Sequence, residues 1–273
     1  MSKPDNNSAK GRTVTKLEKA GGIFMVIPEK LYSNLEDNIH LFQNILPLNK
    51  SFDIITREIS LGSTPCFFIG LNGMCDLQII QWLFAEIEAP DFQSSADQNV
   101  STLPQFVKDQ FFYAQITFSS SPGDMIDNLL SGPCLLLIDG YSQGLIIDTR
   151  KYPARSIEEP DTEKVIQGSK DGFTETLLTN CNLIRRRLRI PELTFSLQKI
   201  GTYSKTDVAI AYIENHCDTQ LLQELKQTLN NLEVTALTMG IQSLKELLVK
   251  KSIFHPMPSL FMTARPDVAC RYL

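Results

Sequence analysis

The sequence predicts an α/β protein made of two similar mixed-sheet lobes, which a linker joins and which could leave a cleft between them. Three observations support this prediction. Strand-like and helix-like segments alternate along the chain. A shift of 142 residues lays Cys66–Leu83 over Val208–Leu225 with five identical residues, and both segments have the pattern of a strand, a turn, a Cys-Asp pair and a helix. A charged, aperiodic stretch with Pro153 and Pro160 separates the two similar parts.

These observations divide the chain into four segments. We expect a flexible basic N-terminal tail over residues 1–27, a first lobe over 28–149, a linker over 150–171 and a second lobe over 172–273. The tail holds five basic and two acidic residues, which gives it a net charge of +3, and the other residues, 21 basic and 29 acidic, carry −8. Such a tail either faces an anionic surface or keeps the protein in solution.

The first lobe should begin with an amphipathic helix over 28–48, because apolar residues recur there at helical spacing and Pro47 ends the pattern. Asp76 should cap a later helix, and Pro122 suits the first turn of another. The polar residues 89–102 are expected to form a loop. Further helices are expected at 77–87, 103–111 and 122–131, and strands at 52–59, 65–71, 113–118, 134–139 and 145–148.

The second lobe should open with a helix from Gly172 to Leu188, which Pro191 prevents from continuing. Its apolar stripe would consist of Phe173, Leu177, Cys181, Ile184 and Leu188. Asp218 should cap a helix that ends near residue 232. Strands are expected at 193–200 and 208–213, and a further strand and helix over 234–251.

The end of the second lobe is expected to be truncated. With a shift of 143 residues, Asp124 falls on Asp267 and Leu130 falls on Leu273. In the first lobe a pair of strands follows Leu130, and the chain holds no counterpart of that pair in the second lobe. The second lobe is therefore expected to have an incomplete sheet with an exposed edge.

Composition excludes several classes of protein. The chain of 273 residues is 42% hydrophobic and 21% charged, which is globular composition rather than that of a disordered or collagen-like chain. A net charge of −5 gives no basic footprint for nucleic acid, so we expect no nucleic-acid partner. No apolar run approaches the ~18 residues that a membrane span needs. The polar start of the chain does not resemble a signal peptide.

No catalytic or metal-binding motif is found. The six cysteines form no C-x-x-C pair, and the three histidines have no metal-ligand spacing, so buried reduced thiols are expected. P-loop, G-x-G-x-x-G and G-x-S-x-G motifs are absent from the sequence, and the carboxylates form no convincing acid–base pair. We therefore expect no catalytic residues, no metal, no cofactor and no enzymatic activity.

The most unusual residues lie between Ser156 and Leu193, with a related group near the end of the chain. They are Glu159-Pro160, Gly168, Gly172-Phe173-Thr174-Glu175, Asn180, Leu183-Ile184-Arg185-Arg186-Arg187, Pro191-Glu192-Leu193 and Thr263-Ala264-Arg265-Pro266-Asp267. In these features the chain resembles the A subunit of spore germinant receptors, the GerA family. The resemblance runs over most of residues 50–273, and Ala264 replaces the glutamate of the family's pattern.

The resemblance implies a soluble N-terminal domain that precedes a membrane-spanning region absent from this chain. The intact protein would lie in the spore inner membrane, with this domain on the cytoplasmic side, in the spore core. Its partners would be the receptor subunits B and C, and its ligands small nutrient germinants such as amino acids or sugars. The function expected on this basis is germinant sensing and signal relay. The alternative is an assembly scaffold that docks the B and C subunits without binding a ligand.

Three arginines, Arg185, Arg186 and Arg187, end the first helix of the second lobe, where positive charge complements the helix dipole. They either form a solvated helix end or clamp carboxylates through their guanidinium forks. The carboxylate could belong to Glu158, Glu159 or Asp161 of the linker, which would lock the lobes together, or to another subunit or a ligand anion. Glu175 is expected in the first turn of the same helix.

The other candidate ligand or interface residues are Phe173, Asn180, Arg265 and Asp267. Asn180 could instead bond to neighbouring backbone, as half-buried asparagines commonly do. Gly168 and Gly172 stand ahead of the expected helix start. They could present free N–H groups to an anion, or they could supply positive φ in a turn.

Overall fold

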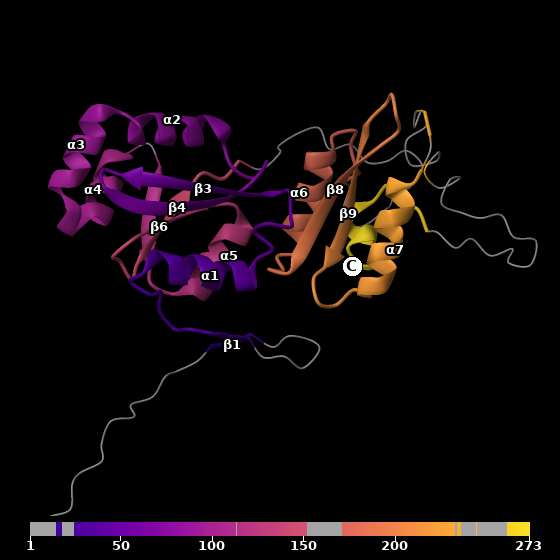
Figure 1. Ribbon diagram of the computed structural model, residues 1–273, viewed down its shortest axis with the longest axis horizontal. Coiled ribbons are helices and arrows are strands. Elements are labelled where there is room, and N and C mark those ends of the chain that lie inside the picture. Colours follow the sequence, from indigo (N-terminus) through magenta and orange to yellow (C-terminus); the bar gives the residue numbers. More distant parts are fainter. Residues whose placement is uncertain are drawn as a thin grey trace, which may run out of the picture.

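A computed structural model describes residues 15–17, 25–112, 114–151, 171–232, 234–235, 244 and 261–273. Within these residues the strands form one five-stranded sheet and two two-stranded sheets, which share no strand (Figure 1). We call residues 28–149 the N-terminal unit and the described residues from 171 onward the C-terminal unit. The predicted α/β class is confirmed. The expected mixed sheets are not found among the described strands, because every ladder there is antiparallel.

The N-terminal unit contains a five-stranded sheet in the order β3-β4-β6-β7-β5. A tight turn joins β3 to β4 and a short loop, residues 139–143, joins β6 to β7, and such hairpins make neighbouring strands antiparallel. The strands are β3 (Ile54–Leu61), β4 (Thr64–Leu71), β5 (Gln115–Ser119), β6 (Cys134–Ile138) and β7 (Gly144–Asp148). Each lies within two residues of its predicted bounds.

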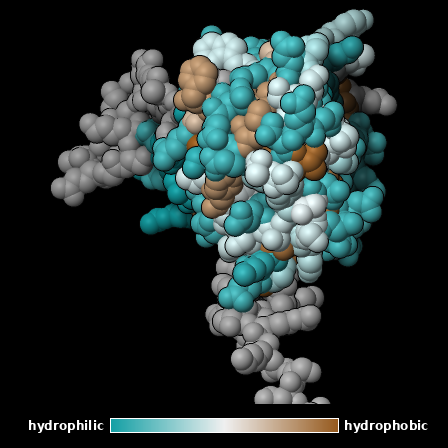
Figure 2. All heavy atoms as spheres, turned by 90° about the vertical axis from the view of Figure 1, so that its left-hand side faces the viewer, coloured by the Kyte–Doolittle hydropathy of each residue, from teal (hydrophilic) through white to brown (hydrophobic). Residues whose placement is uncertain are grey.

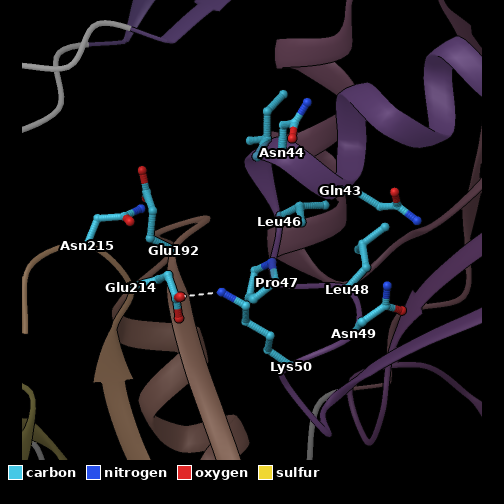
Figure 3. A pocket seen from close by; sticks show the side chains of 11 residues that line it. Gln43, Asn44, Leu46, Pro47, Leu48, Asn49, Lys50, Glu192, Glu214 and Asn215 are labelled. Carbon is cyan, nitrogen blue, oxygen red and sulfur yellow. Dashed lines mark hydrogen bonds and ion pairs between the residues drawn. The ribbon is translucent and has the colours of Figure 1, made fainter. Parts of the chain in front are cut away.

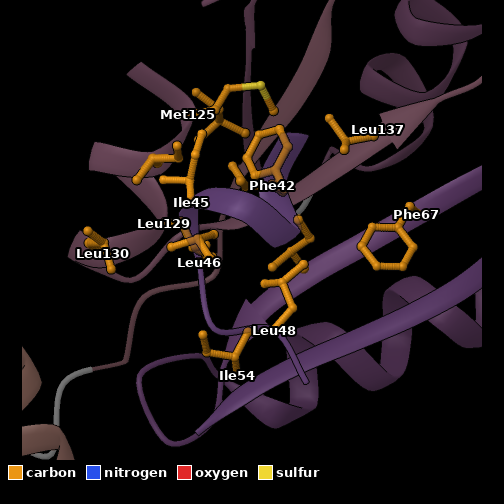
Figure 4. Packing of buried hydrophobic residues seen from close by; sticks show 14 of the residues in the cluster. Phe42, Ile45, Leu46, Leu48, Ile54, Phe67, Met125, Leu129, Leu130 and Leu137 are labelled. Atoms are coloured by element: carbon orange, nitrogen blue, oxygen red, sulfur yellow. The ribbon is translucent and has the colours of Figure 1, made fainter. Parts of the chain in front are cut away.

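Helices cover both faces of this sheet (Figure 1). One face packs against α1 (Leu35–Ile45) and α5 (Pro122–Ser131). The other packs against α2 (Leu77–Ile87), α3 (Pro90–Gln98) and α4 (Leu103–Gln110). Figure 4 shows the first core, in which side chains of α1 and α5 meet those of the sheet.

Two expectations for the N-terminal unit were wrong in detail. The expected loop over 89–102 contains α3 and a short 3-10 helix, Val100–Thr102. Phe92 and Ala96, four positions apart, are buried and hold α3 against the sheet although its composition is polar. The expected helix over 28–48 starts only at α1, because the side chain of Asn34 accepts the N–H of Asp37 and caps it there.

The C-terminal unit has a hairpin of β8 (Leu193–Ile200) and β9 (Thr206–Ile213) between two helices. One face of the hairpin packs against α6 (Leu177–Arg187), and the other packs against α7 (Thr219–Asn230). A short helix, α9 (Pro266–Ala269), contacts α6 near the end of the chain. Helix α6 starts five residues later than expected from Gly172, and Asp218 caps α7 as expected.

Elements of the two units recur at the predicted offset. Helix α6 and strand β9 have the bounds of α1 and β4 shifted by 142 residues, since residues 35 and 64 become 177 and 206. Helix α7 starts 142 residues after α2, and an aspartate caps both. The shared order of helix, hairpin and helix supports the inference of an internal repeat.

The remaining expectations concern residues near the edges of the described ranges. Within the expected tail over 1–27, β1 (Thr15–Leu17) pairs with β2 (Met25–Ile27), and Ile27 joins the core of the N-terminal unit. Most of the expected linker, residues 152–170, and most of 234–251 lie outside the described residues. In the described part of the chain, no helix has both the length and the apolar character that crossing a membrane requires.

Candidate functional site

A buried ion pair joins the two units. Arg185, the ninth residue of α6, is fully buried, and its carboxylate partner is Asp53, which precedes β3 and is 1% exposed. The Arg185 Nε donates to Asp53 Oδ2 at 2.9 Å, and Nη2 donates to Oδ1 at 3.2 Å. This two-point geometry is the strong form of an arginine–carboxylate pair.

Arg185 also donates two hydrogen bonds within the C-terminal unit. Its Nη2 donates to the Leu193 carbonyl at 2.8 Å, and Nη1 donates to the Ile190 carbonyl at 3.3 Å. The guanidinium carbon lies 5.2 Å from the centre of the Phe195 ring. Arg185 therefore fixes the start of β8 and, at the same time, the carboxylate of the other unit.

Main-chain bonds reinforce this connection. The Phe52 N–H donates to the Phe195 carbonyl at 3.1 Å, and the Phe195 N–H donates to Ser51 Oγ at 2.9 Å. Ser51 Oγ in turn donates to Asp53 Oδ1 at 2.5 Å. The rings of Phe52 and Phe195 meet edge to face at 6.4 Å. Residues 51–53 thus attach to the first strand of the other unit by hydrogen bonds, charge and ring contact.

A glycine permits a second close approach between the units. Gly73, in the turn after β4, has a φ of +77° and lies against α6. A Cβ atom at this position would stand 2.2 Å from Asn182 Nδ2 and 3.1 Å from the Leu178 side chain. The predicted Asn72-Gly73 turn therefore needs glycine for its backbone conformation and for its contact with α6.

A polar pocket of about 300 Å³ opens beside this junction (Figure 3). One wall is the end of α1 and the loop after it, Gln43 to Lys50, and the other wall holds Glu192, Glu214 and Asn215 of the C-terminal unit. Figure 3 shows the two walls facing each other across the pocket. The volume lies at the lower end of the ~300–1,000 Å³ that is usual for small-molecule sites.

Opposite charges meet across this pocket. The Lys50 ammonium bonds to Glu214 Oε1, and this ion pair again joins the two units. The other carboxylate oxygen of Glu214 is buried and has no hydrogen-bond partner among the described residues. Together with Glu192 and the amides of Asn44, Asn49 and Asn215, the pair makes a small site that offers a cation, carboxylates and amide groups.

The other two arginines of the cluster bind a different carboxylate. Arg186 and Arg187 both contact Asp171, at 3.2 Å and 2.5 Å. Asp171 is the last residue of the expected linker, whereas Glu158, Glu159 and Asp161 lie outside the described residues. The three arginines thus bind two separate carboxylates, Asp53 and Asp171.

Asn180 clamps backbone, and the N-terminal unit repeats the arrangement. Asn180 Oδ1 accepts the Thr174 N–H at 2.7 Å, and its Nδ2 donates to the Thr174 carbonyl at 2.6 Å. Asn38 makes the same two bonds to Tyr32, at 2.9 Å and 2.8 Å. Asn180 lies 142 residues after Asn38, and Thr174 lies 142 residues after Tyr32. Of the two interpretations of Asn180, the backbone bond is the one seen here, although its side chain also lines an apolar pocket with Phe173.

The clamp also explains two wrong expectations. Because it holds Thr174 outside the helix, Glu175 precedes α6 instead of standing in its first turn, and its side chain is exposed. Gly172 is buried five residues before the helix and is not at its start. Gly168 lies outside the described residues. An anion site at a glycine-flanked start of α6 is therefore not formed by Gly172.

Arg265 and Asp267 bind each other at the start of α9. Arg265 Nη2 lies 2.6 Å from Asp267 Oδ2, and Nε lies 3.1 Å from Oδ1. These bonds hold the pKa of Asp267 below its usual value. They orient the first turn of α9, whose N-cap residue is Arg265.

Sequence reasoning missed Asp53, Lys50 and Glu214. Asp53 is 132 residues from Arg185, and no local pattern marks it as the partner. A possible signal was a lone aspartate between Phe52 and two isoleucines, since a charge inside an apolar strand start needs a partner. No comparable signal marks Lys50 or Glu214.

The described residues hold no metal-binding group, and two of their buried cysteines are poor nucleophiles. They include no group of three or more His, Cys, Asp or Glu side chains that could hold a metal ion. Burial raises the pKa of the Cys66 and Cys181 thiols to about 12, so both stay protonated at neutral pH.

Comparisons with known proteins agree on one family. The family model described as Bacillus/Clostridium GerA spore germination protein matches residues 42–273. The chain is 33% identical over 244 residues to Stage V sporulation protein AF of Bacillus subtilis (strain 168), covering 89% of this chain and 49% of that protein. It is 29% identical over 221 residues to Spore germination protein KA of the same organism, covering 81% of this chain and 40% of that protein. The chain thus spans about half, or less, of the length of these relatives.

A solved structure has a similar fold. It is the crystal structure of the N-terminal domain of the A subunit of the Bacillus megaterium spore germinant receptor GerK3. The TM-score is 0.62 at 25% sequence identity, and the match covers 89% of this chain and 88% of that one.

Proposed function

Since this chain belongs to the GerA family of spore germination proteins, we propose that it senses a small polar nutrient in the pocket between its two units and relays the binding event. The chain is similar to the N-terminal domain of a germinant receptor A subunit. On this proposal the intact protein lies in the spore inner membrane, with this domain on the spore-core side and with the B and C subunits as partners.

The observation that carries the proposal is the charge arrangement of the pocket. An amino acid in solution carries a carboxylate and an ammonium group. Lys50 supplies a cation for the first, and Glu192 and Glu214 supply anions for the second. The surrounding amides offer donors and acceptors that also suit the hydroxyl groups of a sugar.

The position of the pocket supports a relay. Lys50 stands one residue from Ser51 and three residues from Asp53, which bind the C-terminal unit at the buried junction. A ligand that bonds to Lys50 and Glu214 replaces their mutual ion pair. It would therefore change how the two units are held together. To shift the equilibrium between two relative positions of the units, the ligand must bind one of them more tightly than the other.

The second candidate, a scaffold that docks the B and C subunits, is favoured by a different observation. The buried Asp53–Arg185 pair already joins the two units without a ligand. A rigid body of this kind presents fixed surfaces, and the partly exposed Arg186 and Arg187 could belong to one of them.

Thermal unfolding with a panel of amino acids and sugars tests the sensing function. A ligand that binds the folded state raises the melting temperature with its concentration. We expect at least one member of the panel to do so at millimolar concentration, and we expect Lys50→Met and Glu214→Gln to abolish the effect. Lys199→Met is the matched control, because Lys199 forms an exposed ion pair with Asp207 on the β8–β9 hairpin and does not line the pocket.

A panel without any effect on the melting temperature favours the scaffold. In that case Arg186→Ala and Arg187→Ala should weaken capture of the B or C subunit while the fold of this chain stays intact. Unchanged capture by both variants would contradict a scaffold that uses these arginines.

A further inference from the structure

One edge of the C-terminal sheet has no neighbour in the described part of the chain. Strand β9 pairs with β8 along one edge, and no described strand pairs with its other edge. In the N-terminal unit the equivalent strand, β4, is central, since it pairs with β3 on one side and with β6 on the other. An unpaired strand edge presents N–H and C=O groups that can bind another strand.

The repeat shows what stands beside such an edge. Residues 66–69 of β4 pair with Ile138 to Leu135 of β6, and β7 then separates β6 from β5. At the same offset, residues 66–69 correspond to Val208–Ala211 of β9. Two strand positions therefore lie between β9 and the counterpart of β5.

The far side of this gap is formed by residues 261–264. In the N-terminal unit the Leu31 N–H donates to the carbonyl of Ser120, two residues before the proline that starts α5. In the C-terminal unit the Phe173 N–H donates to the carbonyl of Ala264, two residues before the proline that starts α9. Both distances are 2.8 Å. Residues 261–264 therefore stand where the end of β5 stands in the other unit.

An apolar pocket of about 660 Å³ occupies this place. It lies between α6, the sheet face of β9 and the segment Met262–Ala264. Leu177 and Ile184 of α6, which line it, are the counterparts of Leu35 and Phe42 of α1. In the N-terminal unit these two residues belong to the same core as Leu135 and Leu137 of β6, which fill the equivalent space.

The side chains of β9 leave room for large neighbours. Ala209 and Ala211 line the pocket, and Phe67 and Ile69 hold the corresponding positions in β4. The partners of Phe67 and Ile69 across the ladder are Leu137 and Leu135. Small residues on the strand favour bulky side chains on whatever pairs with it.

We propose that the free edge of β9 and this pocket receive an antiparallel hairpin of two apolar strands, with bulky aliphatic side chains against Ala209 and Ala211. The occupant that we propose is a segment of the same polypeptide. The relatives are about twice as long as the matched region, and the similar solved structure is that of an N-terminal domain, so its intact subunit continues beyond it. This inference is independent of the nutrient pocket, which is lined by residues just before β8 and just after β9 and shares no residue with the apolar pocket.

An appended copy of the chain's own hairpin tests the proposal. Residues 133–148, which contain β6 and β7, are added after Leu273 through two glycines. We expect those amides of Val208–Ala211 that point away from β8 to exchange with solvent at least tenfold more slowly than in the parent chain, and we expect the melting temperature to rise. The matched control carries Leu135→Asp and Leu137→Asp in the appended copy only, and it should leave both quantities at the parent values.

Two results would overturn the proposal. One is an unchanged exchange rate in the extended chain at the amides of Val208–Ala211 that point away from β8, or equal slowing by the control copy. The other concerns the source of the hairpin: in intact Stage V sporulation protein AF, the strand that matches β9 should have protected amides also on the edge that points away from the strand matching β8. Fast exchange there would exclude a segment of the same polypeptide as the occupant.

Discussion

At the scale of single residues, Arg185 and Asp53 dominate the connection between the units. Both side chains are about 1% exposed, so each would be an uncompensated buried charge without the other. Arg185→Met should therefore lower the free energy of unfolding by about 3–5 kcal/mol. The double variant Asp53→Leu, Arg185→Met removes both charges and should recover much of that loss, as measured by urea unfolding.

Arg186→Met is the control for this experiment. Arg186 is one third exposed and shares Asp171 with Arg187, so its loss should cost less than about 1 kcal/mol. A cost for Arg185→Met as small as that of the control would contradict the assignment of Arg185 as the residue that joins the units.

The pair of Asp148 and Arg150 predicts a pH dependence. Hydrogen bonds from the Arg150 guanidinium hold the pKa of Asp148, at the end of β7, below its usual value. Because the pKa is lower in the folded state, the ionised carboxylate stabilises the fold above about pH 4, and this contribution disappears as the pH falls through the folded-state pKa.

Asp148→Asn should therefore flatten the decline in unfolding free energy between about pH 5 and pH 3. The effect should be below about 1 kcal/mol, since both side chains are partly exposed. Arg150→Met should flatten it in the same way. A decline as steep as that of the parent in both variants would contradict this account.

At the scale of elements, local sequence signals were reliable where one residue type decides the geometry. Asp76 and Asp218 cap α2 and α7, and Gly132, with a φ of +119°, ends α5. The signals failed where burial overrides composition. Helix α3 is polar overall, and the burial of Phe92 and Ala96 that holds it cannot be inferred from composition.

The predicted start of α6 at Gly172 was wrong for a different reason. The apolar stripe continues back to Phe173, but the clamp by Asn180 keeps Thr174 out of the helix. A side chain that bonds to the backbone six residues earlier does not change the spacing of apolar residues, so the sequence pattern does not reveal it. Asn38 holds the backbone of Tyr32 outside α1 in the same way, so the expected helix over 28–48 does not reach back to residue 28.

The two clamps predict paired effects. Asn38→Ala and Asn180→Ala each remove two hydrogen bonds and leave backbone groups of a packed segment without partners, so each should cost about 1–3 kcal/mol. Urea unfolding measures the cost, and amide exchange should quicken at Tyr32 in the first variant and at Thr174 in the second. A variant that unfolds like the parent, with unchanged exchange, would contradict the role of the clamp in that unit.

At the scale of the whole molecule, the repeat was predictable and the junction was not. Five identities at an offset of 142 predicted two similar units, and the bounds of α1, β4 and their counterparts follow that offset. The junction depends on Asp53 meeting Arg185 across 132 residues, which no periodicity encodes. The identity of the family, by contrast, was readable from short motifs in the second half of the chain.

Figure 2 shows the end of the molecule that the N-terminal unit forms. The end of the molecule seen in Figure 2 is mainly hydrophilic, with apolar side chains in separate places among polar ones. The features that distinguish the molecule instead lie at the junction and in the C-terminal unit: the polar pocket and the free edge of β9.

The most direct test of the central claim is nuclear magnetic resonance of the isotope-labelled chain during titration with amino acids and sugars. If the pocket between the units is the nutrient site, a ligand at millimolar concentration should shift the amide resonances of Lys50, Glu192 and Glu214, and Glu214→Gln should remove those shifts. Resonances that stay in place at these three residues for every compound, or that move only at the apolar pocket beside β9, would contradict the claim.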